Sequence, residues 1–325
     1  MIKMLPFTFY EASIGDCDTP TTFAIFGIPW DANSTHNHGC SRGAPYKLRE
    51  LTSFLGCATE MGDDISQFPM HDYGDVKILS SKPEQTRSNI REFIKEMLPW
   101  NKCQPIPVMI GGDHYCTYPV VQALHDRWKE SQNNLNNSFG VIVFDAHLDY
   151  YDKWLDEESD FHCTVTKRIA DLPKISSKNV AVIGVRDMDI PELEQAKQDN
   201  LTYIPAYKLQ SYEQILEEIT FLCKKFHSQG ITEIYVSIDI DVLDGGIVPG
   251  TGYSIPGGMT YRQLWNALKF LTSQFHIIGF DIVEVAPDLD LPTNLTQITA
   301  VKLITEFMSF ILQKIQKEKK ENSKS

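Results

Sequence analysis

Residues 139–149, FGVIVFDAHLD, combine an unbroken apolar run with two aspartates and a histidine at its end. The run lacks polar residues at alternate positions, which is typical of a strand that is buried on both faces. Five further runs share this character: FAIFGI (23–28), IPVMI (106–110), NVAVIGV (179–185), EIYVSI (233–238) and HIIGFDIV (276–283). Such strands occur mainly in parallel sheets that are covered by helices on both sides.

Amphipathic stretches alternate with these runs along the chain. They predict helices near 43–55, 84–98, 117–131, 164–171, 190–199, 211–229, 260–273 and 296–317. Alternating strands and helices favour a parallel sheet, because each crossover helix returns the chain to the same end of the sheet. We therefore predict an α/β fold with three layers, α/β/α, around a mainly parallel central sheet.

Acidic residues and histidines gather where four of the predicted strands end. The candidates are His114 after 106–110, Asp145, His147 and Asp149 after 139–144, Asp239 and Asp241 after 233–238, and Glu284 after 276–283. In an open parallel sheet, functional sites form beyond the carboxyl ends of the strands. The sequence therefore predicts that these four segments meet in one crevice.

The chemistry of these residues indicates a pair of divalent cations. If the strand geometry continues, Asp145, His147 and Asp149 project to one side, and so do Asp239 and Asp241. Carboxylate and imidazole ligands suit Mn²⁺ and related ions, and no cysteine cluster suggests structural zinc. Clustered carboxylates repel one another unless cations offset their charge. One such cluster alone is often a turn, but the combination favours a metal site.

Composition excludes several other classes of function. The chain has 325 residues and a net charge of −13, with 30 Lys and Arg against 43 Asp and Glu. This acidity disfavours nucleic acid as a partner and favours small cations. Seven cysteines without a C-x-x-C pair fit reduced thiols. We see no secretory signal and no apolar run of about 18 residues, so we expect a cytoplasmic protein without a membrane partner.

Three motifs resemble those of the ureohydrolase family, which includes arginases and agmatinases. They are GGDH (111–114), DAHLD (145–149) and SIDIDVLD (237–244), in the family's order. The resemblance spans roughly residues 22–310 and implies an arginase-like fold with two Mn²⁺ per subunit, although Ni²⁺ or Co²⁺ accept the same ligands. It implies one ion on His114, Asp145, Asp149 and Asp239, and a second on Asp145, His147, Asp239 and Asp241.

The composition and the extent of the resemblance together indicate how the chain is divided. Residues 1–312 are expected to form a single ureohydrolase catalytic domain, and residues 1–21 of it an N-terminal arm that either covers the core or takes part in an oligomer contact. The polar segment 313–325, QKIQKEKKENSKS, is expected to be a tail in which a fraying helix end is followed by disorder. Family resemblance further suggests a homo-oligomer, either a trimer or a hexamer.

Further similarity points to the agmatinase branch. GIPWDANSTHNHGCSRGAPYKLREL (27–51) resembles the N-terminal block of that branch. FHCTVTKRIA (161–170) resembles the block with a catalytic histidine, which implies that His162 relays a proton. DIVEVAPDLD (281–290) implies that Glu284 binds the guanidinium group, and Asp149 is expected to accept a proton. Tyr151 matches this branch, whereas Asp189 is similar to an arginase residue that meets the substrate's amino group.

Four positions depart from the family pattern. Tyr115 replaces a Ser, Cys163 replaces a Gly, Gly245 replaces a Pro, and Tyr253 stands where a small hydroxyl residue is usual. A phenol at Tyr253 adds volume near the guanidinium group and would reshape the pocket.

The expected reaction is hydrolysis of a guanidino compound to urea and an amine. Agmatine, which would give putrescine, is the first hypothesis, because the segment 150–160, YYDKWLDEESD, is bulky and acidic and would repel a carboxylate. The alternatives are arginine, guanidinobutyrate, guanidinopropionate or guanidine as substrate, or a metal-binding pseudoenzyme that regulates a partner.

Overall fold

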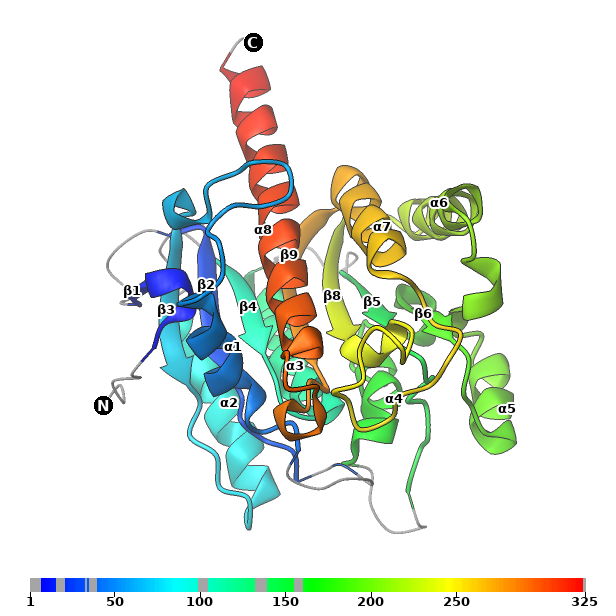
Figure 1. Ribbon diagram of the computed structural model, residues 1–325. Coiled ribbons are helices and arrows are strands. Elements are labelled where there is room, and N and C mark those ends of the chain that lie inside the picture. The colour runs from blue at the N-terminus through cyan, green and yellow to red at the C-terminus, as the bar shows by residue number, and fades with distance from the viewer. Residues whose placement is uncertain are drawn as a thin grey trace.

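The computed structural model describes residues 7–15, 21–32, 34, 40–98, 105–131, 139–154 and 160–323. Within these residues nine strands form one sheet in the order β1-β3-β2-β4-β9-β8-β5-β6-β7 (Figure 1). Every neighbouring pair is parallel. The strands are β1 (Ser13–Ile14), β2 (Phe23–Gly27), β3 (Met70–Asp75), β4 (Ile106–Ile110), β5 (Gly140–Phe144), β6 (Val180–Val185), β7 (Thr202–Pro205), β8 (Glu233–Asp239) and β9 (His276–Val283).

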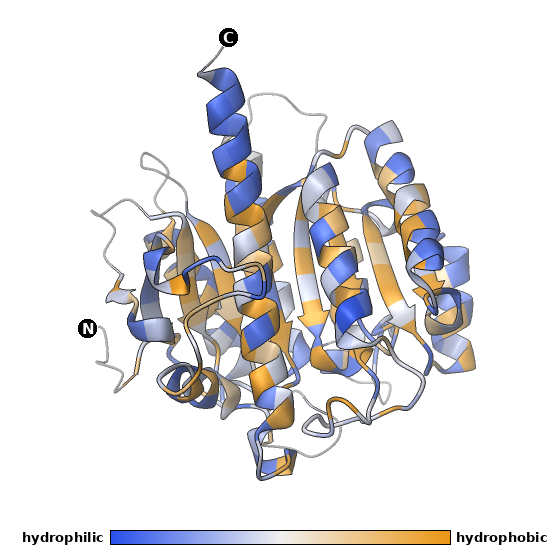
Figure 2. Ribbon diagram, turned by 45° about the horizontal axis from the view of Figure 1, so that its top comes forward, coloured by the Kyte–Doolittle hydropathy of each residue, from blue (hydrophilic) through white to orange (hydrophobic). Residues whose placement is uncertain are grey.

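Helices cover both faces of the sheet. One apolar core lies under α1 (Ala44–Thr52), α6 (Tyr212–Ser228), α7 (Tyr261–Gln274) and α8 (Leu295–Asn322). A second core lies under α2 (Pro83–Met97), α3 (Thr117–Ser131), α4 (Val165–Ala170) and α5 (Ile190–Gln198). Figure 2 shows apolar residues concentrated on the strands and on the helix faces turned toward them. The predicted three-layer α/β/α architecture is confirmed.

The six predicted strands are β2, β4, β5, β6, β8 and β9, whereas the sequence analysis missed β1, β3 and β7. Strand β3 reads MHDYGD, so no apolar run marks it. Its Asp72 is nevertheless buried, because Arg49 of α1 pairs with both of its carboxylate oxygens at 2.7 and 2.9 Å. A buried ion pair thus replaces the apolar pattern that normally identifies an inner strand.

The N-terminal arm packs against this edge of the sheet where the structure describes it. Phe9 and Tyr10 are buried, and the backbone N–H of Phe9 donates to Asp72 Oδ2 at 2.9 Å. Residues 13–14 add β1 beside β3. Residues 1–6 and 16–20 of the predicted arm lie outside the described residues.

Residues 313–322 continue α8 to Asn322, beyond the predicted helix end at 317, so the disorder predicted after that end is wrong as far as Asn322. Lys, Gln and Glu are good helix formers, and contacts anchor the first of these turns. Gln313 Nε2 donates to Asp63 Oδ2 at 2.9 Å, and Lys314 Nζ donates to the carbonyl of Phe275 at 2.8 Å. Figure 2 shows the hydrophilic end of the helix extending past the sheet.

Helix α8 is long and apolar enough to cross a membrane by length and composition. However, 78% of its most apolar window is buried inside the protein. Its apolar face packs against the sheet and the neighbouring α1 and α7, as in the core helix of a globular domain.

The order of the strands positions the site. β4, β9, β8 and β5 are consecutive neighbours in the sheet. These are the four strands whose carboxyl ends carry the acidic and histidine clusters. The clusters are distant in sequence, yet the topology brings them to adjacent positions along one edge.

Candidate metal centre

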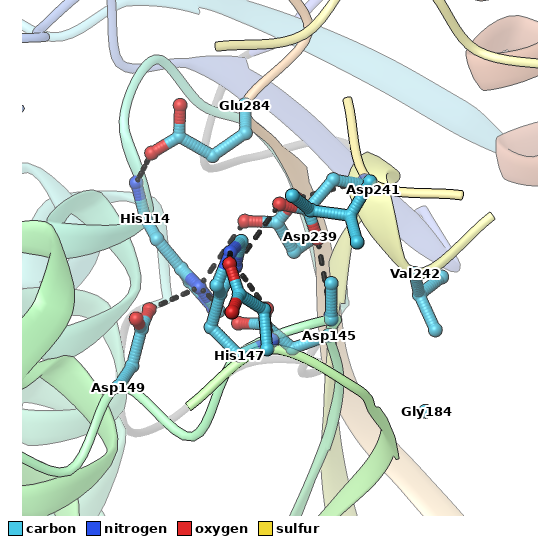
Figure 3. Close-up of polar contacts among 12 residues, drawn as sticks. His114, Asp145, His147, Asp149, Gly184, Asp239, Asp241, Val242 and Glu284 are labelled. Atoms are coloured by element: carbon cyan, nitrogen blue, oxygen red, sulfur yellow. Dashed lines mark hydrogen bonds and ion pairs between the residues drawn. The ribbon is translucent and has the colours of Figure 1, made fainter. Parts of the chain in front are cut away.

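All residues predicted for the site gather at the carboxyl ends of these strands. Figure 3 shows the six metal-ligand candidates and Glu284 close together. They are His114, Asp145, His147, Asp149, Tyr151, His162, Asp189, Asp239, Asp241, Tyr253 and Glu284. Five of the six metal-ligand candidates, all except His147, are buried. His147, Asp149, Asp239 and Asp241 line the same cavity as the residues predicted to bind substrate.

His114 is the centre of the first group of potential ligands. Its Nδ1 lies 2.9 Å from Asp145 Oδ2, 3.0 Å from Asp149 Oδ2 and 3.4 Å from Asp239 Oδ2. His114, Asp145 and Asp239 are buried, and one donor atom from each falls within 4.8 Å of the others. This spacing allows all three to bind one ion.

His147 is the centre of the second group. Its Nδ1 lies 3.1 Å from Asp241 Oδ2 and 3.3 Å from Asp145 Oδ1. Asp145 therefore contributes one oxygen to each group, as expected of a carboxylate that bridges two ions. Both groups fit the ligand sets implied by the sequence motifs.

The side chains of the two groups leave donor atoms and negative charge that divalent cations would satisfy. Although His114 Nδ1 and Asp145 Oδ2 lie 2.9 Å apart, neither of these buried atoms makes a hydrogen bond of acceptable geometry within the described residues. Burial and the nearby Asp241 and Asp145 raise the pKa of Asp239 well above its usual range. Burial also disfavours the charge on Asp145, yet contacts with His114 and His147 hold its pKa below the usual range. Cations would satisfy the open donor atoms and offset the clustered charge.

The route by which the ligands converge differs from the predicted one. β5 ends at Phe144, and Asp149 adopts a left-handed conformation with φ 50°. Beyond Asp239 the chain turns into a 3₁₀ helix, η7 (Ile240–Val242), so Asp241 is not in strand geometry. Its N–H donates to Asp239 Oδ1 at 2.9 Å. Turns after the strands therefore aim these side chains, rather than strand alternation continued past the sheet.

Glu284 shares the left-handed conformation of Asp149, with φ 59°. Non-glycine residues rarely adopt it, and it persists where surrounding contacts enforce it. One such contact is explicit: the N–H of His114 donates to Glu284 Oε1 at 2.8 Å. The carboxylate is thus held beside the predicted metal ligands.

Two glycines allow the close packing behind the site. A Cβ on Gly112 of the Gly-Gly-Asp-His motif would lie 2.1 Å from the carbonyl oxygen of Trp30. Gly184 has φ +108°, and a Cβ there would meet Val242 Cγ2 at 2.5 Å and the carbonyl oxygen of Asp145 at 3.1 Å. Larger residues would push the ligand-bearing turns apart.

A buried network that the sequence analysis missed orients His114. Its Nε2 lies 3.1 Å from Ser237 Oγ, which donates to Asp281 Oδ1 at 2.7 Å. Tyr235 and Thr117 both donate to Asp281 Oδ2, at 2.6 and 3.0 Å. Because Ser237 donates to Asp281, its oxygen accepts from Nε2–H, which leaves Nδ1 to face the carboxylates. The one sequence feature that could have indicated this network is Asp281, an aspartate inside an otherwise apolar predicted strand.

A cavity of about 240 Å³ opens above the two ligand groups. Carboxylates and aromatic rings line it, including Asp187, Asp189, Tyr151 and Trp154, and no Lys or Arg is among its lining residues in the described part of the chain. Tyr151 OH donates to Asp189 Oδ2. Such a cavity favours a cationic occupant.

The sequence analysis also missed Trp154, Thr251 and Glu192 as lining residues. Glu192 is the first buried residue of α5, and burial raises its pKa to about 8. The sequence feature that could have indicated Glu192 is its position three residues after Asp189, a predicted site residue. Trp154 stacks edge-on against Tyr151, with ring centroids 5.3 Å apart.

His162 and Glu284 meet at the cavity wall, where His162 Nδ1 lies 3.4 Å from Glu284 Oε1. Burial alone would lower the pKa of His162. The contact with Glu284 and the nearby charges of Asp149 and Asp113 outweigh burial and raise that pKa to about 9. His162 therefore holds a proton next to the residue predicted to bind the guanidinium group.

Three of the four departures from the family pattern lie in the cavity lining or in a closely packed loop. Tyr253 lines the cavity, and its ring lies edge-on to His147 with centroids 5.6 Å apart. Cys163 also lines it and is half-buried. A Cβ on Gly245 would approach Ser254 Oγ to 2.5 Å, so that loop packs closely.

Comparison with known proteins agrees with this geometry. The sequence profile of the Arginase family matches residues 21–309. The chain belongs to the arginase family. It is therefore a ureohydrolase, a hydrolase of C–N bonds in linear amidines, and the family uses a binuclear Mn²⁺ centre. The two ligand groups are candidates for that centre.

Named relatives include agmatinases and related enzymes. The chain is 30% identical over 298 residues to an agmatinase of Pyrococcus horikoshii, covering 89% of this chain and 94% of that protein. It is 29% identical over 286 residues to an N(1)-aminopropylagmatine ureohydrolase of Thermococcus kodakarensis, covering 87% and 88%. The fold is also similar to that of Bacillus subtilis formimidoylglutamase, with a TM-score of 0.82, 22% identity, and coverage of 96% and 94%.

Metal binding by the enzyme should stabilise it more at alkaline pH. Burial opposes the charge on His114 and His147, but the adjacent aspartates raise the pKa of both well above the usual range. In metal-free protein these protons stabilise the site at low pH, and this stabilisation is lost as the pH rises through the raised pKa values. Metal must displace the same protons.

We therefore expect the thermal shift produced by Mn²⁺ to be roughly 5 °C larger at about pH 8.5 than at about pH 6. Thermal unfolding with and without Mn²⁺ at both pH values measures this difference. A shift that is equal or smaller at the higher pH would contradict the competition between protons and metal.

Proposed function

We propose that the enzyme hydrolyses agmatine to urea and putrescine at a centre of two Mn²⁺ ions. The observation that carries this proposal is the acidic and aromatic cavity directly above two ligand groups that share Asp145. A substrate with a guanidinium group at one end and an ammonium group at the other matches that charge. The similarity to named agmatinases supports the same substrate.

The metal ions, when bound by the two groups, would act as Lewis acids and lower the pKa of a water molecule that serves as nucleophile. The guanidinium carbon is a poor electrophile, so its position must be fixed. Glu284 would bind the guanidinium through charge-assisted hydrogen bonds. Its Oε1 is already held by His114 N–H, which gives the carboxylate one orientation.

His162 and Asp149 would handle the protons. Asp149 lies against His114 at the floor of the cavity and would accept a proton from the attacking water. The departing amine needs a proton, and His162 would supply it, because its raised pKa keeps it charged near neutral pH. Both side chains line the same cavity, so the proton acceptor and the donor face one bound molecule.

The outer part of the cavity would select the second charge. Asp187 and Asp189 would attract an ammonium group, and the rings of Tyr151 and Trp154 would contact the methylene chain. A carboxylate at that end, as in guanidinobutyrate, would be repelled. N(1)-Aminopropylagmatine is the second candidate, since a relative with 29% identity is named for it and its added amine is also cationic.

A panel of guanidino compounds tests the proposal. Urea release by the Mn²⁺-loaded enzyme should be at least roughly 100-fold higher in kcat/KM for agmatine than for arginine or guanidinobutyrate. The panel should include N(1)-aminopropylagmatine, guanidinopropionate and guanidine, with Ni²⁺ and Co²⁺ as parallel loadings. A preference for a carboxylated compound would contradict the cationic selection, and binding of metal without any turnover would favour a regulatory role.

A further inference from the structure

Tyr115, the residue that replaces the usual Ser after Gly-Gly-Asp-His, lies immediately behind the site. It belongs to the 3₁₀ turn η3 (His114–Cys116) and is fully buried. Its ring packs edge-on against Trp30 with centroids 5.7 Å apart, and at a tilt against Tyr118 with centroids 5.8 Å apart. These contacts fix the direction of its hydroxyl group.

That hydroxyl completes a closed set of three contacts. Tyr115 OH donates to Asp160 Oδ1 at 2.6 Å, and Arg87 NH1 of α2 donates to Tyr115 OH at 2.9 Å. Arg87 also pairs with Asp160 Oδ2. The side chains of Arg87 and Asp160 are only 23% and 27% exposed, so water screens the ion pair incompletely. We call these three residues the Asp160 clamp.

The Asp160 clamp holds the start of the turn that carries His162. Phe161 caps η4 (His162–Thr164), and Thr164 Oγ1 donates to the carbonyl of Phe161 at 2.8 Å. The N–H of Thr164 bonds to the same carbonyl at 3.0 Å. His162 therefore lies between a clamped residue and a closed turn, with little freedom to move along the cavity wall.

The turn η3 also holds the partner of His162. The N–H of His114 binds Glu284 Oε1 at 2.8 Å, and the next residue, Tyr115, binds Asp160 at 2.6 Å. Two consecutive residues thus locate Glu284 and the His162 turn relative to each other. The contact between His162 Nδ1 and Glu284 Oε1, at 3.4 Å, is the result.

We infer that Tyr115 is a positioning residue for His162, acting through Asp160 to place its imidazole against Glu284 and the bound substrate. The inference rests on the proposed function, in which His162 passes a proton to the leaving amine. A merely structural role would predict that loss of the hydroxyl affects the enzyme equally whether or not His162 is present.

A double-mutant cycle separates these roles. With Mn²⁺ and agmatine, Tyr115→Phe should lower kcat about 10-fold while KM and metal stoichiometry change less than about twofold. In a His162→Ala background the same substitution should change kcat less than about twofold. Tyr118→Phe, which removes a neighbouring hydroxyl from the same aromatic cluster, is the matched control and should retain wild-type kcat. An equal loss in both backgrounds would overturn the inference, and so would a Tyr115→Phe enzyme as active as the control.

Hydrogen exchange gives a readout that needs no substrate. Amides of residues 160–166 should exchange at least several-fold faster in Tyr115→Phe and in Asp160→Ala, while amides of residues 143–149 keep wild-type rates. Unchanged exchange in 160–166 would overturn the inference even if the enzyme fails to hydrolyse agmatine. Conversely, suppose that the wild-type enzyme does not hydrolyse agmatine but the predicted exchange rates are observed. The proposed substrate would then be rejected, whereas the role of the Asp160 clamp in holding the His162 turn would be supported.

Discussion

Asp241→Ala is expected to lower kcat for urea release by at least roughly 10³-fold while the fold remains intact. Asp241 Oδ2 lies 3.1 Å from His147 Nδ1, and Oδ1 accepts the N–H of Ala146 at 3.1 Å. The substitution therefore removes one ligand of the second group and loosens the turn that carries His147. One ion should be bound weakly, because Asp145, His147 and Asp239 without Asp241 give an incomplete ligand set.

Metal analysis and steady-state kinetics measure the two effects together. Metal content after dialysis should fall from two ions per chain toward one, and circular dichroism should remain that of the wild type. Asp126→Ala, which removes an aspartate that pairs with Arg91 away from the site, is the control for loss of a carboxylate. Full activity of Asp241→Ala with two ions retained would show that this residue is not a ligand.

Glu284→Gln is expected to lower kcat/KM by roughly 10²- to 10³-fold without loss of metal. The amide has nearly the same shape and its oxygen can still accept the His114 N–H, so the local structure should persist. What disappears is the charge that would hold the guanidinium. The loss should be smaller for substrates whose binding depends mainly on the outer carboxylates.

Kinetics and metal analysis on the same preparation test this expectation. Glu218→Gln, at the surface beside Lys208, controls for removal of a carboxylate elsewhere and should leave kcat/KM unchanged. A Glu284→Gln enzyme with wild-type kcat/KM would show that the guanidinium binds elsewhere in the cavity.

The sheet and the metal-ligand candidates were predictable because their signals are local. Apolar runs such as 139–144 identify strands buried on both faces, and parallel topology requires that their carboxyl ends share an edge. The convergence of Asp145 and Asp239 follows from that rule without knowledge of the exact turns. The turns themselves, with the left-handed Asp149 and the 3₁₀ geometry at Asp241, depend on tertiary contacts and were not predictable.

Features that depend on a partner distant in sequence were missed. Strand β3 was not recognised because its Asp72 is buried through contacts with distant residues, chiefly the ion pair with Arg49, 23 residues earlier. Asp281 lies inside the predicted strand 276–283, and its hydrogen-bond partners Ser237 and Tyr235 come from another strand, β8. In such cases a polar residue has a core position through its hydrogen bonds, and periodicity gives no sign of it.

Tyr115 is a further residue whose role depends on partners distant in sequence. The sequence marked it as a departure from the family pattern, but its consequence required the positions of Arg87 and Asp160. Likewise nothing in the sequence distinguishes Trp154 and Glu192 from the other aromatic and acidic residues, and only the structure places them in the cavity lining. Sequence motifs thus indicated the reaction centre and part of the cavity wall, such as Tyr151, Asp189 and Tyr253, whereas Trp154 and Glu192 required the fold.

Anomalous diffraction from crystals grown with Mn²⁺ tests most directly whether these side chains bind a pair of ions. We expect two peaks about 3.5 Å apart, one against His114 and one against His147, with Asp145 contacting both. A single peak, or peaks elsewhere on the molecule, would contradict the binuclear centre.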